Sequence, residues 1–292
     1  MKPPPFSLVR AESIDDAVEI IAAGEGGARV LAGGQSLIPM LRARSVRPAQ
    51  LVDIHAIENL RAITARGSWV DVGAMVTHRA LATWAAANGQ EMMSEAAGYI
   101  GHPAIRSMGT VAGSLAHADP SAEWGAVALA LEAKVMVAGP DGRRVVAAGD
   151  LFSGPFSTSL DFSEMIVGVR FPYVGGGTGA MFVEVAARRG DPAVAGVAAL
   201  IRVSRYGKIS KAHIGLAGLA PTPVRATSVE AALAGLPFNA DLADAVREVG
   251  SDISPPSDIH GSDRYRNRVA PVVVERAVRG AIERAVAVQG AP

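Results

Sequence analysis

The chain has 292 residues, of which 32 are glycine and none is cysteine, and its 28 basic residues balance 28 acidic ones. Without cysteine it cannot itself hold an iron–sulfur cluster or a thiolate zinc site, form a disulfide or use a thiol nucleophile. A formal net charge of zero argues against a nucleic-acid binder, which usually carries a basic excess. Any redox chemistry must therefore use a bound organic cofactor or be passed to another chain.

The length corresponds to about two domains of roughly 150 residues each. Hydrophobic residues make up 49% of the chain, which is ample for a packed core. The first residues, Met1 to Pro5, are not followed by a long apolar segment, and no run of about 20 apolar residues occurs in the sequence. We therefore expect a cytoplasmic protein with neither a secretory signal nor a membrane-spanning helix.

The first predicted element is a helix that Ser13 caps, with Asp16 in the capping-box position and Gly24 at its end. Its apolar face is formed by Ile14, Ala17, Val18 and Ile21. A short apolar strand at residues 29–32 then runs into residues 33–36, Gly-Gly-Gln-Ser. The pattern is that of an αβ unit ending in a glycine loop.

The next segments alternate between strand and helix patterns. Alternation and β-branching predict strands at 51–54 and 69–74, and Thr77 caps a predicted helix over 78–88. Residues 101–120 are rich in small side chains and show no long period, which predicts loop and short strand. A helix is expected at about 121–131, followed by a β-hairpin of strands 134–138 and 143–147.

The best candidate for a domain boundary is the stretch from Pro172 to Gly179, where four glycines make a flexible connection. Strands are expected beyond it at 181–187, 196–204 and 209–217. Helices follow: one behind a capping box of Thr227 and Glu230, one marked by Leu242, Val246 and Val249, and a terminal one over 264–288 that Pro271 kinks or begins. This order of elements predicts an α+β fold.

Two loops have the composition of a phosphate site. Residues 32–36 (Ala-Gly-Gly-Gln-Ser) and residues 109–114 (Gly-Thr-Val-Ala-Gly-Ser) combine small side chains with hydroxyls. Glycines at a strand end let successive N–H groups point at one spot, and such a nest binds phosphate. The first loop alone is better explained as a tight turn in a glycine-rich chain. Two such loops, about 75 positions apart, could grip one diphosphate from two sides, and for the pair the two explanations are equally good.

His117, Asp119 and Glu123 invite a catalytic interpretation, because a His–Asp pair can act as acid and base. The interpretation we favour for Asp119 is that it caps the helix that follows. Glu123 could instead accept hydrogen bonds from ligand hydroxyls, such as those of a ribityl chain.

Other polar residues are ambiguous. His102 and Arg106 fit a solvated loop or an ion pair better than a ligand contact. The run from Arg188 to Asp191 fits a surface turn with an internal salt bridge, and equally a surface that faces a flavin edge or a partner chain. The remaining histidines show no metal-ligand spacing, so we name no metal ligand.

The loops, in this order, resemble the two FAD motifs of the medium, flavin-binding subunit of molybdenum hydroxylases, the carbon monoxide dehydrogenase and xanthine dehydrogenase family. Residues 32–39 resemble the first motif, and residues 110–114 followed by 118–120 resemble the second. The stretch 189–193 and the tail 257–266 resemble the C-terminal domain of that family.

The resemblance implies a two-domain fold. Residues 1–174 would form an FAD-binding domain of the vanillyl-alcohol-oxidase (PCMH) type, with subdomains at about 1–54 and 55–174. Residues 180–288 would form a C-terminal domain with a small antiparallel sheet and helices.

The resemblance also implies a set of FAD contacts. The diphosphate would lie against the two loops, Ile100 would pack on the flavin, and a backbone contact at Ile166 would reach the ring. Glu123 takes the place of an aspartate that binds the ribityl region. The full set of expected cofactor-binding residues is Leu31, Ala32, Gly33, Gly34, Gln35, Ser36, Leu37, Ile100, Gly109, Thr110, Ala112, Gly113, Ser114, Asp119, Glu123 and Ile166.

Three positions depart from the family pattern. Ala112 replaces the first glycine of the usual pair, and Gln35 stands where histidine is common. Glu184 falls near a lysine that contacts the flavin in some relatives. The role of that lysine does not carry over, and a carboxylate there would not stabilise a reduced anionic flavin.

The resemblance implies an electron-transfer subunit, and we therefore name no catalytic side chain in this sequence. It would bind FAD, take electrons from [2Fe–2S] clusters on a small partner subunit and pass them to an external acceptor, while a large molybdopterin subunit hydroxylates the substrate. A dimer of such heterotrimers is expected. The alternatives are a stand-alone flavin oxidase or reductase, and an interaction subunit that has lost its flavin.

Overall fold

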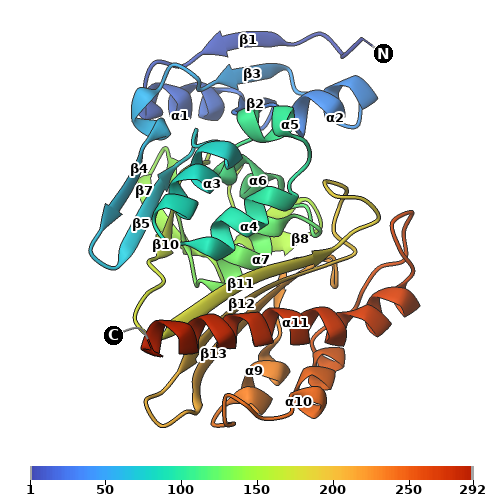
Figure 1. The fold of residues 1–292 in the computed structure, drawn as a ribbon. Coiled ribbons are helices and arrows are strands. Elements are labelled where there is room, and N and C mark those ends of the chain that lie inside the picture. The colour runs from blue at the N-terminus through green and yellow to red at the C-terminus, as the bar shows by residue number, and fades with distance from the viewer. Residues whose placement is uncertain (1, 291–292) are drawn as a thin grey trace.

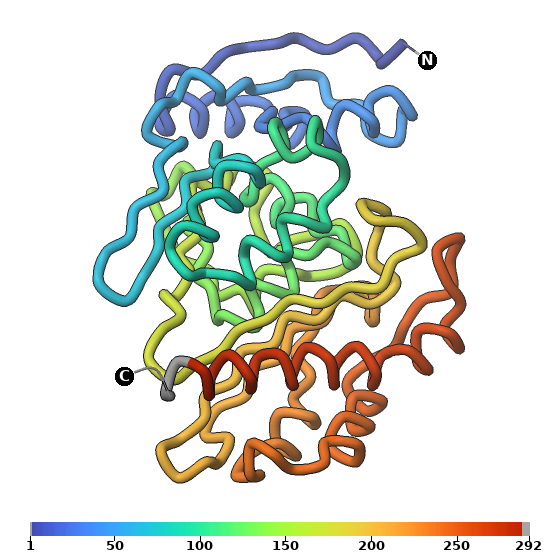
Figure 2. Tube along the Cα trace, in the orientation of Figure 1, coloured from blue at the N-terminus to red at the C-terminus, as the bar shows by residue number. Residues whose placement is uncertain are grey.

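The computed structural model describes residues 2–290, with side chains to residue 287. Three main sheets follow one another along the chain, each covered by helices (Figure 1). Figure 2 traces the chain from the blue N-terminal part through the green middle to the orange and red C-terminal part. The predicted α+β class is confirmed. Across these residues no helix combines the length and apolar character needed to cross a membrane.

The first sheet is small and parallel, with strand order β1-β3-β2. Its strands are β1 (Ser7–Arg10), β2 (Ala28–Leu31) and β3 (Gln50–Asp53), connected through α1 (Ile14–Ala23) and α2 (Leu37–Ala43). Ser13 caps α1 as predicted, because its hydroxyl accepts the N–H of Asp16 at 3.0 Å. The Asp16 carboxylate accepts the N–H of Glu12 at 2.8 Å, one residue before the expected partner. The αβ unit therefore delivers the glycine loop at the end of β2.

The second sheet has five antiparallel strands in the order β4-β5-β10-β6-β7. They are β4 (Ile63–Arg66), β5 (Trp69–Gly73), β6 (Lys134–Gly139), β7 (Gly142–Ala147) and β10 (Met165–Pro172). The β6–β7 hairpin was predicted, and its register runs from Lys134 opposite Ala147 to Gly139 opposite Gly142. Short elements connect β3 to β4 and β7 to β10: η1 (Glu58–Arg61), α8 (Ala148–Leu151), β8 (Phe152–Gly154) and β9 (Ser157–Thr158).

A group of helices accompanies this sheet, and two of them contradict the sequence prediction. The helices are α3 (His78–Ala87), α4 (Glu91–Tyr99), α5 (Pro103–Met108), α6 (Val111–His117) and α7 (Glu123–Ala130). Residues 101–120, expected as loop and short strand, instead contain α5 and α6. Pro103 occupies the first turn of α5, where its missing N–H costs nothing, and Thr110 caps α6. Both helices are too short for a periodic pattern to be visible.

The C-terminal part is built on an antiparallel sheet in the order β11-β12-β13-β14. It comprises β11 (Thr178–Val185), β12 (Ala195–Val203), β13 (Ile209–Ala217) and β14 (Val224–Arg225), followed by α9 (Thr227–Leu233), α10 (Ala243–Arg247), η2 (Glu248–Ser251) and α11 (Asp263–Gly290). The three long strands were predicted. Pro271 lies inside α11, which begins eight positions before it.

The predicted capping box of Thr227 and Glu230 is wrong. Ala226 occupies the N-cap position of α9, without a side-chain bond. Glu230 instead pairs with Arg225 through two hydrogen bonds of 2.6 Å and accepts the N–H of Ile214 at 2.7 Å. A partner on the neighbouring strands therefore outcompetes the local cap.

The two faces of the C-terminal sheet have different neighbours. Val197, Ala199 and Ile201 of β12 belong to the core under α9, α10 and α11. Ala198 and Leu200, which alternate with them, belong to the core of the N-terminal part, where β11 contacts α4 and β13 contacts α7. Figure 1 shows α11 running along one side of this sheet and the helices of the middle part on the other. The two parts of the chain therefore share one sheet as a wall.

Candidate flavin site

The two glycine loops, far apart in sequence, are in contact. A Cβ built on Gly33 would lie 2.6 Å from the Cα of Gly109 and closer still to the carbonyl oxygen of Met108. Real Cβ atoms essentially never approach so closely, so only glycine fits at position 33. The expectation that both loops face one ligand requires this juxtaposition.

The first loop presents unpaired donors. Within the described chain, the backbone N–H groups of residues 33–36 have no hydrogen-bond acceptor, and the Ser36 hydroxyl makes no capping bond although it precedes α2. Gly34 adopts a φ of +71°, which L side chains rarely adopt. The Gln35 amide folds back and donates to the Gly33 carbonyl oxygen at 3.1 Å. Successive free N–H groups of this kind fit an anionic ligand such as a diphosphate.

The second loop is fixed by its own side chains. The Thr110 hydroxyl accepts the N–H of Gly113 at 3.0 Å and so caps α6. A Cβ on Gly113 would lie 2.7 Å from the Thr110 Oγ1 and would break this cap. Ala112 is 3% exposed and packs in the hydrophobic core. The methyl group that departs from the family pattern is therefore buried and does not line the open side of the loop.

A buried histidine that sequence reasoning missed supports the second loop. The backbone N–H of His78 donates to the Gly109 carbonyl oxygen at 2.9 Å, and its Nδ1 accepts the indole N–H of Trp124, also at 2.9 Å. Burial, together with the charge of Arg106, lowers the pKa of His78 to about 4. A neutral ring can accept this bond at Nδ1, whereas a protonated one cannot. Because these contacts join segments that are distant in sequence, no local motif predicts them.

The segment around Ile100 is held between the two parts of the chain. Arg106 donates to the carbonyl oxygens of Ile100 at 2.9 Å and Gly101 at 2.8 Å, which accounts for Arg106 without a ligand. Gly190, with a φ of +92°, packs on Gly101 so closely that a Cβ would lie 2.7 Å from the Gly101 carbonyl oxygen. The turn after β11 is thereby placed against the entrance to α5.

The same turn corrects one interpretation of residues 188–191. Among the described ion pairs, none joins Asp191 to Arg188 or Arg189. The turn is closed by the Asp191 N–H, which donates to the Arg188 carbonyl oxygen at 3.1 Å. Arg189 reaches across the seam: its Nε donates to the Gly98 carbonyl oxygen at 3.3 Å, and its guanidinium lies 5.8 Å from the centre of the Tyr99 ring.

The acidic candidates beyond α6 are arranged differently from the prediction. Asp119 does not cap α7, since Ala122 holds the N-cap position; its carboxylate accepts the N–H of Ser121 at 2.9 Å. His117 packs on the ring of Phe156, and burial lowers its pKa. Burial, and secondarily the charge of Asp119, raises the pKa of Glu123 to about 8. Glu123 is therefore mostly a neutral acid at pH 7, able to donate as well as accept hydrogen bonds.

The remaining expected contacts lie around the loops. Leu31 ends β2 and Leu37 begins α2, and both are half-buried, as is Ala32. Ile166 is 6% exposed on β10, opposite Val137 at a register shift, and β10 contacts α6. In the described part of the chain, no three His, Asp or Glu side chains are placed to hold a metal ion.

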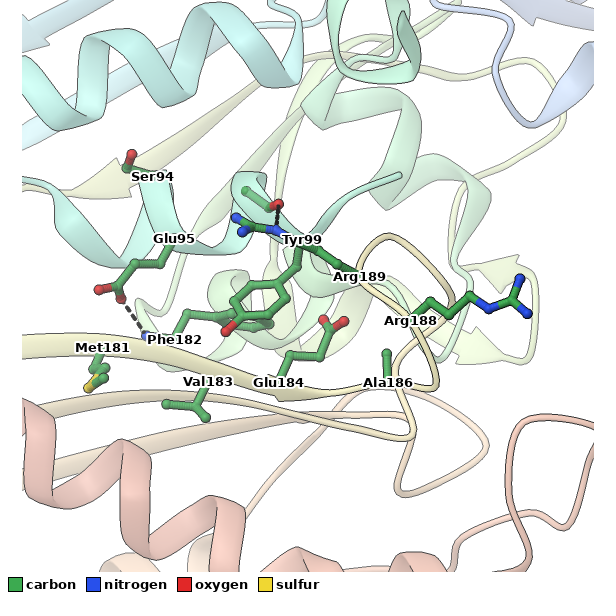
Figure 3. Close-up of a pocket in the computed structure, with 11 residues that line it drawn as sticks. Ser94, Glu95, Tyr99, Met181, Phe182, Val183, Glu184, Ala186, Arg188 and Arg189 are labelled. Atoms are coloured by element: carbon green, nitrogen blue, oxygen red, sulfur yellow. Dashed lines mark hydrogen bonds between the residues drawn. The ribbon is translucent and has the colours of Figure 1, made fainter. Parts of the chain in front are cut away.

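A cavity of about 640 Å³ opens at the seam between α4 and β11 (Figure 3). Glu184 lines it and is 8% exposed. Burial, together with the charge of Glu123, raises the pKa of Glu184 to about 9. Nothing in the local sequence of β11 signals this burial, because it arises from helices α4 and α7 of the other part.

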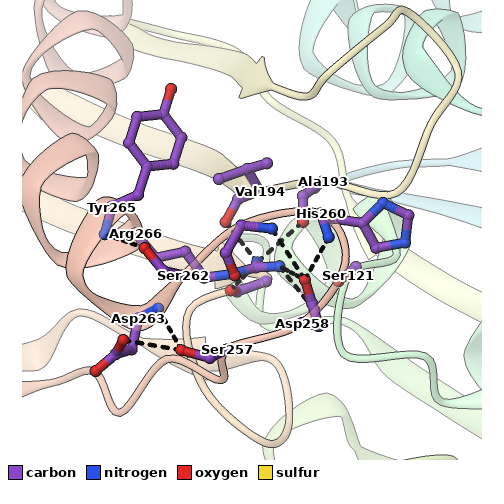
Figure 4. Close-up of polar contacts among 12 residues, drawn as sticks. Ser121, Ala193, Val194, Ser257, Asp258, His260, Ser262, Asp263, Tyr265 and Arg266 are labelled. Atoms are coloured by element: carbon purple, nitrogen blue, oxygen red, sulfur yellow. Dashed lines mark hydrogen bonds and ion pairs between the residues drawn. The ribbon is translucent and has the colours of Figure 1, made fainter.

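Arg266 fixes the segments next to this seam (Figure 4). Its fully buried Nη1 donates to the carbonyl oxygens of Ala193, Val194 and Gly218 at 3.3, 2.8 and 2.6 Å, and its Nη2 contacts both carboxylate oxygens of Asp258 at 2.8 Å. The N–H of Gly218 in turn donates to the carbonyl oxygen of Pro120 at 2.8 Å. The resemblance in the tail thus corresponds to a clamp that joins α11 to the residues just before β12 and just after β13. Gly218 links this clamp to the loop that precedes α7.

Comparison with known families matches both parts of the chain. Residues 4–174 match the family described as "FAD binding domain in molybdopterin dehydrogenase", and residues 180–281 match "CO dehydrogenase flavoprotein C-terminal domain". The chain is 37% identical to the 6-hydroxypseudooxynicotine dehydrogenase complex subunit alpha of Paenarthrobacter nicotinovorans over 98% of this chain and 97% of that protein. It is 34% identical to the carbon monoxide dehydrogenase medium chain of Hydrogenophaga pseudoflava over 96% and 98% of the two chains.

Solved structures give the same result. A chain of carbon monoxide dehydrogenase from Hydrogenophaga pseudoflava superposes with a TM-score of 0.93 at 35% identity, covering 97% of this chain and 99% of that one. A chain of quinoline 2-oxidoreductase from Pseudomonas putida 86 superposes with a TM-score of 0.90 at 32% identity, covering 98% and 99%.

Proposed function

Because the chain belongs to the family of FAD-binding domains of molybdopterin dehydrogenases, continued by a carbon monoxide dehydrogenase flavoprotein C-terminal domain, we propose that it is the electron-transfer subunit of a molybdenum hydroxylase complex. The resemblance drawn from the motifs is confirmed, and with it the assignment of the chain as an FAD-binding component of an oxidoreductase. When bound, FAD supplies the one- and two-electron chemistry that the side chains lack.

The observation that carries the proposal is the contact between the two glycine loops. The free N–H groups of residues 33–36 lie beside Gly109, and the Thr110 cap holds the following turn in shape. We assign the FAD diphosphate to these loops, with Ala112, Gly113 and Ser114 on its second side. The residues present fit the cofactor, since small side chains and unpaired donors are what a diphosphate needs.

The other expected contacts complete the assignment. Leu31, Ala32 and Leu37 would flank the first loop, while Ile100 and Ile166 would approach the ring. Asp119 and Glu123 would bind the ribityl hydroxyls. As a mostly neutral acid, Glu123 can donate to such a hydroxyl, a role that an ionised carboxylate cannot perform.

The chain would work within a larger complex. Relatives are named as a medium chain, a medium subunit or a complex subunit. We propose a small partner that holds [2Fe–2S] clusters and a large partner that holds the molybdopterin cofactor, assembled as a cytoplasmic dimer of heterotrimers. Electrons would pass from the clusters through the FAD to an external acceptor. The absence of cysteine from this sequence requires cluster thiolates to come from another chain.

We also propose that the chain divides into residues 1–174, with subdomains at about 1–54 and 55–174, and residues 180–288. Supporting this, the parallel sheet ends at Asp53, the five-stranded sheet at Pro172, and the C-terminal sheet begins at Thr178. The task of the two domains would be to hold the flavin at their seam, within electron-transfer reach of the cluster subunit.

The test is to tag this chain in its native host and purify whatever accompanies it. We expect one FAD per chain, iron and molybdenum on co-purifying chains, and no substrate turnover by the isolated chain. A complex without flavin absorption bands would support the interaction-subunit alternative. Substrate turnover by the chain alone would support the stand-alone oxidase.

A further inference from the structure

Glu184 of β11 is a buried acid without a partner. It is 8% exposed, and neither carboxyl oxygen has a hydrogen-bond partner within the described residues. A buried polar group without a partner destabilises a fold, and a charged one does so more strongly. A side chain in this state fits a site that a ligand completes.

The cavity beside Glu184 has the size and position for such a ligand. Its volume of about 640 Å³ falls within the range of small-molecule sites, roughly 300–1,000 Å³. One wall is the end of α4 with Tyr99, and the other is β11 with the turn to Arg189 (Figure 3). The α4 wall continues into Ile100, which Arg106 of α5 holds, and α5 leads into the second glycine loop.

The charged groups around Glu184 are already engaged or point elsewhere. Glu95 of α4 pairs with Arg284 and accepts the N–H of Phe182 at 2.9 Å. Arg189 is bonded to the Gly98 carbonyl oxygen, and the exposed Arg188 points away from Glu184 in Figure 3. Glu123 of α7 adds a like charge when ionised. Among the residues that the structure describes, no cation therefore neutralises Glu184, and its surroundings favour the protonated form.

We propose that Glu184 is a neutral carboxylic acid that donates a hydrogen bond to the edge of the flavin ring and tunes its reduction potential. This rests on the proposed function, because it requires FAD on this chain. The edge of the flavin ring bears acceptor atoms, and hydrogen bonds to them tune its electronics. A protonated carboxyl group can donate a hydrogen bond to these acceptor atoms, whereas an ionised carboxylate cannot. Glu184 is a positioning and tuning residue and takes no part in electron transfer itself.

The main test compares flavin potentials in the purified complex. Glu184→Ala removes the donor, Glu184→Gln keeps a neutral donor of similar shape, and Glu248→Gln changes an exposed acid elsewhere in the same domain. With Ala we expect full FAD content and an about tenfold weaker preference for the reduced flavin, which is about 30 mV for two electrons. Gln and the control should remain within a factor of about two to three of the wild type.

A second readout does not depend on FAD. At pH 7 the infrared spectrum of the cofactor-free chain should contain protonated-carboxyl absorption from both Glu123 and Glu184. Glu184→Gln should remove the part that Glu184 contributes, while Glu248→Gln should leave the absorption unchanged. Protonated-carboxyl absorption of equal intensity in the wild type and in Glu184→Gln would overturn the proposal. So would an unchanged potential in a fully loaded Glu184→Ala complex, which would leave the proposed function intact. A wild-type complex without FAD would overturn both.

Discussion

Gly33 and Met108 touch through their backbones, and this contact joins the two halves of the proposed diphosphate site. A Cβ on Gly33 would lie against the Met108 carbonyl oxygen and 2.6 Å from the Gly109 Cα. Position 33 therefore serves loop-to-loop packing as well as ligand access. A substitution as small as alanine should separate the loops.

We predict that Gly33→Ala lowers the FAD content of the purified complex by about tenfold or more, since relieving an overpacked contact typically costs about 1–3 kcal/mol. The measurement is flavin absorbance per chain after gel filtration. Gly250→Ala is the matched control, because a Cβ there meets nothing within 4 Å. Equal flavin content in both variants would show that the loops tolerate separation.

Thr110→Val should weaken the second loop without adding bulk. It removes the hydroxyl that accepts the Gly113 N–H at 3.0 Å, and loss of an N-cap costs about 1 kcal/mol. We expect an about fivefold higher dissociation constant for FAD, measured by fluorescence titration of the deflavinated complex. Thr110→Ser keeps the hydroxyl and should bind as the wild type does. If Ser and Val bind equally, the cap does not shape the site.

Arg266→Met tests the clamp at the seam. It leaves the carbonyl oxygens of Ala193, Val194 and Gly218 without their donor, and removing one member of a buried polar pair costs about 3–5 kcal/mol. Urea denaturation of the full chain should show a clear loss of stability. Arg279→Met removes an exposed pair with Glu275 and should cost at most about 0.5 kcal/mol. Comparable midpoints for both variants would rule out the clamp.

The two buried acids predict how stability depends on pH. The pKa values of Glu123 and Glu184 lie at about 8 and about 9 in the folded chain, above their ordinary value of 4.5. Between the ordinary pKa of 4.5 and these raised values, the folded state binds more protons than the unfolded state. The free energy of unfolding therefore falls as the pH rises through this range. The limiting slope is about 1.4 kcal/mol per pH unit for each group.

Denaturation of the flavin-free chain between pH 6 and pH 9.5 should show this decline. Glu184→Gln should make the decline less steep, because only Glu123 then titrates in this range, while Glu248→Gln should leave the slope unchanged. Parallel curves for wild type and Glu184→Gln would mean that Glu184 is already ionised at neutral pH.

Local chemistry predicted much of the fold. The Ser13 cap, the β6–β7 hairpin and the long strands of the C-terminal sheet depend on neighbouring residues, and they form as expected. Helices α5 and α6 escaped detection because a helix of six or seven residues shows less than two turns of period, and small side chains hide its apolar face. Glu230 was misassigned because its partner, Arg225, competes with the local N–H groups.

The residues of the site also fall into those that local sequence predicts and those that depend on contacts between distant segments. Glycine loops are visible in sequence because their backbone conformation needs glycine, as at Gly34 with its φ of +71°. The support from His78, the clamp of Arg266 and the burial of Glu184 arise from contacts between distant segments. No spacing rule encodes them, so only the assembled fold reveals these residues.

Because the two parts of the chain share one sheet as a wall, the glycine-rich connection at residues 175–177 does not act as a hinge between them. The connection is anchored just before it, where the Gln90 amide bonds to both the N–H and the carbonyl oxygen of Val174. The relative position of the two parts is set by apolar contact along one face of β11–β13, with Phe182 and Leu200 buried there. If the chain were cut at these glycines, each fragment alone would therefore expose an apolar surface, and the two fragments should reassemble when mixed. The two proposed domains are distinct in sequence, but their shared core should make them move as one body.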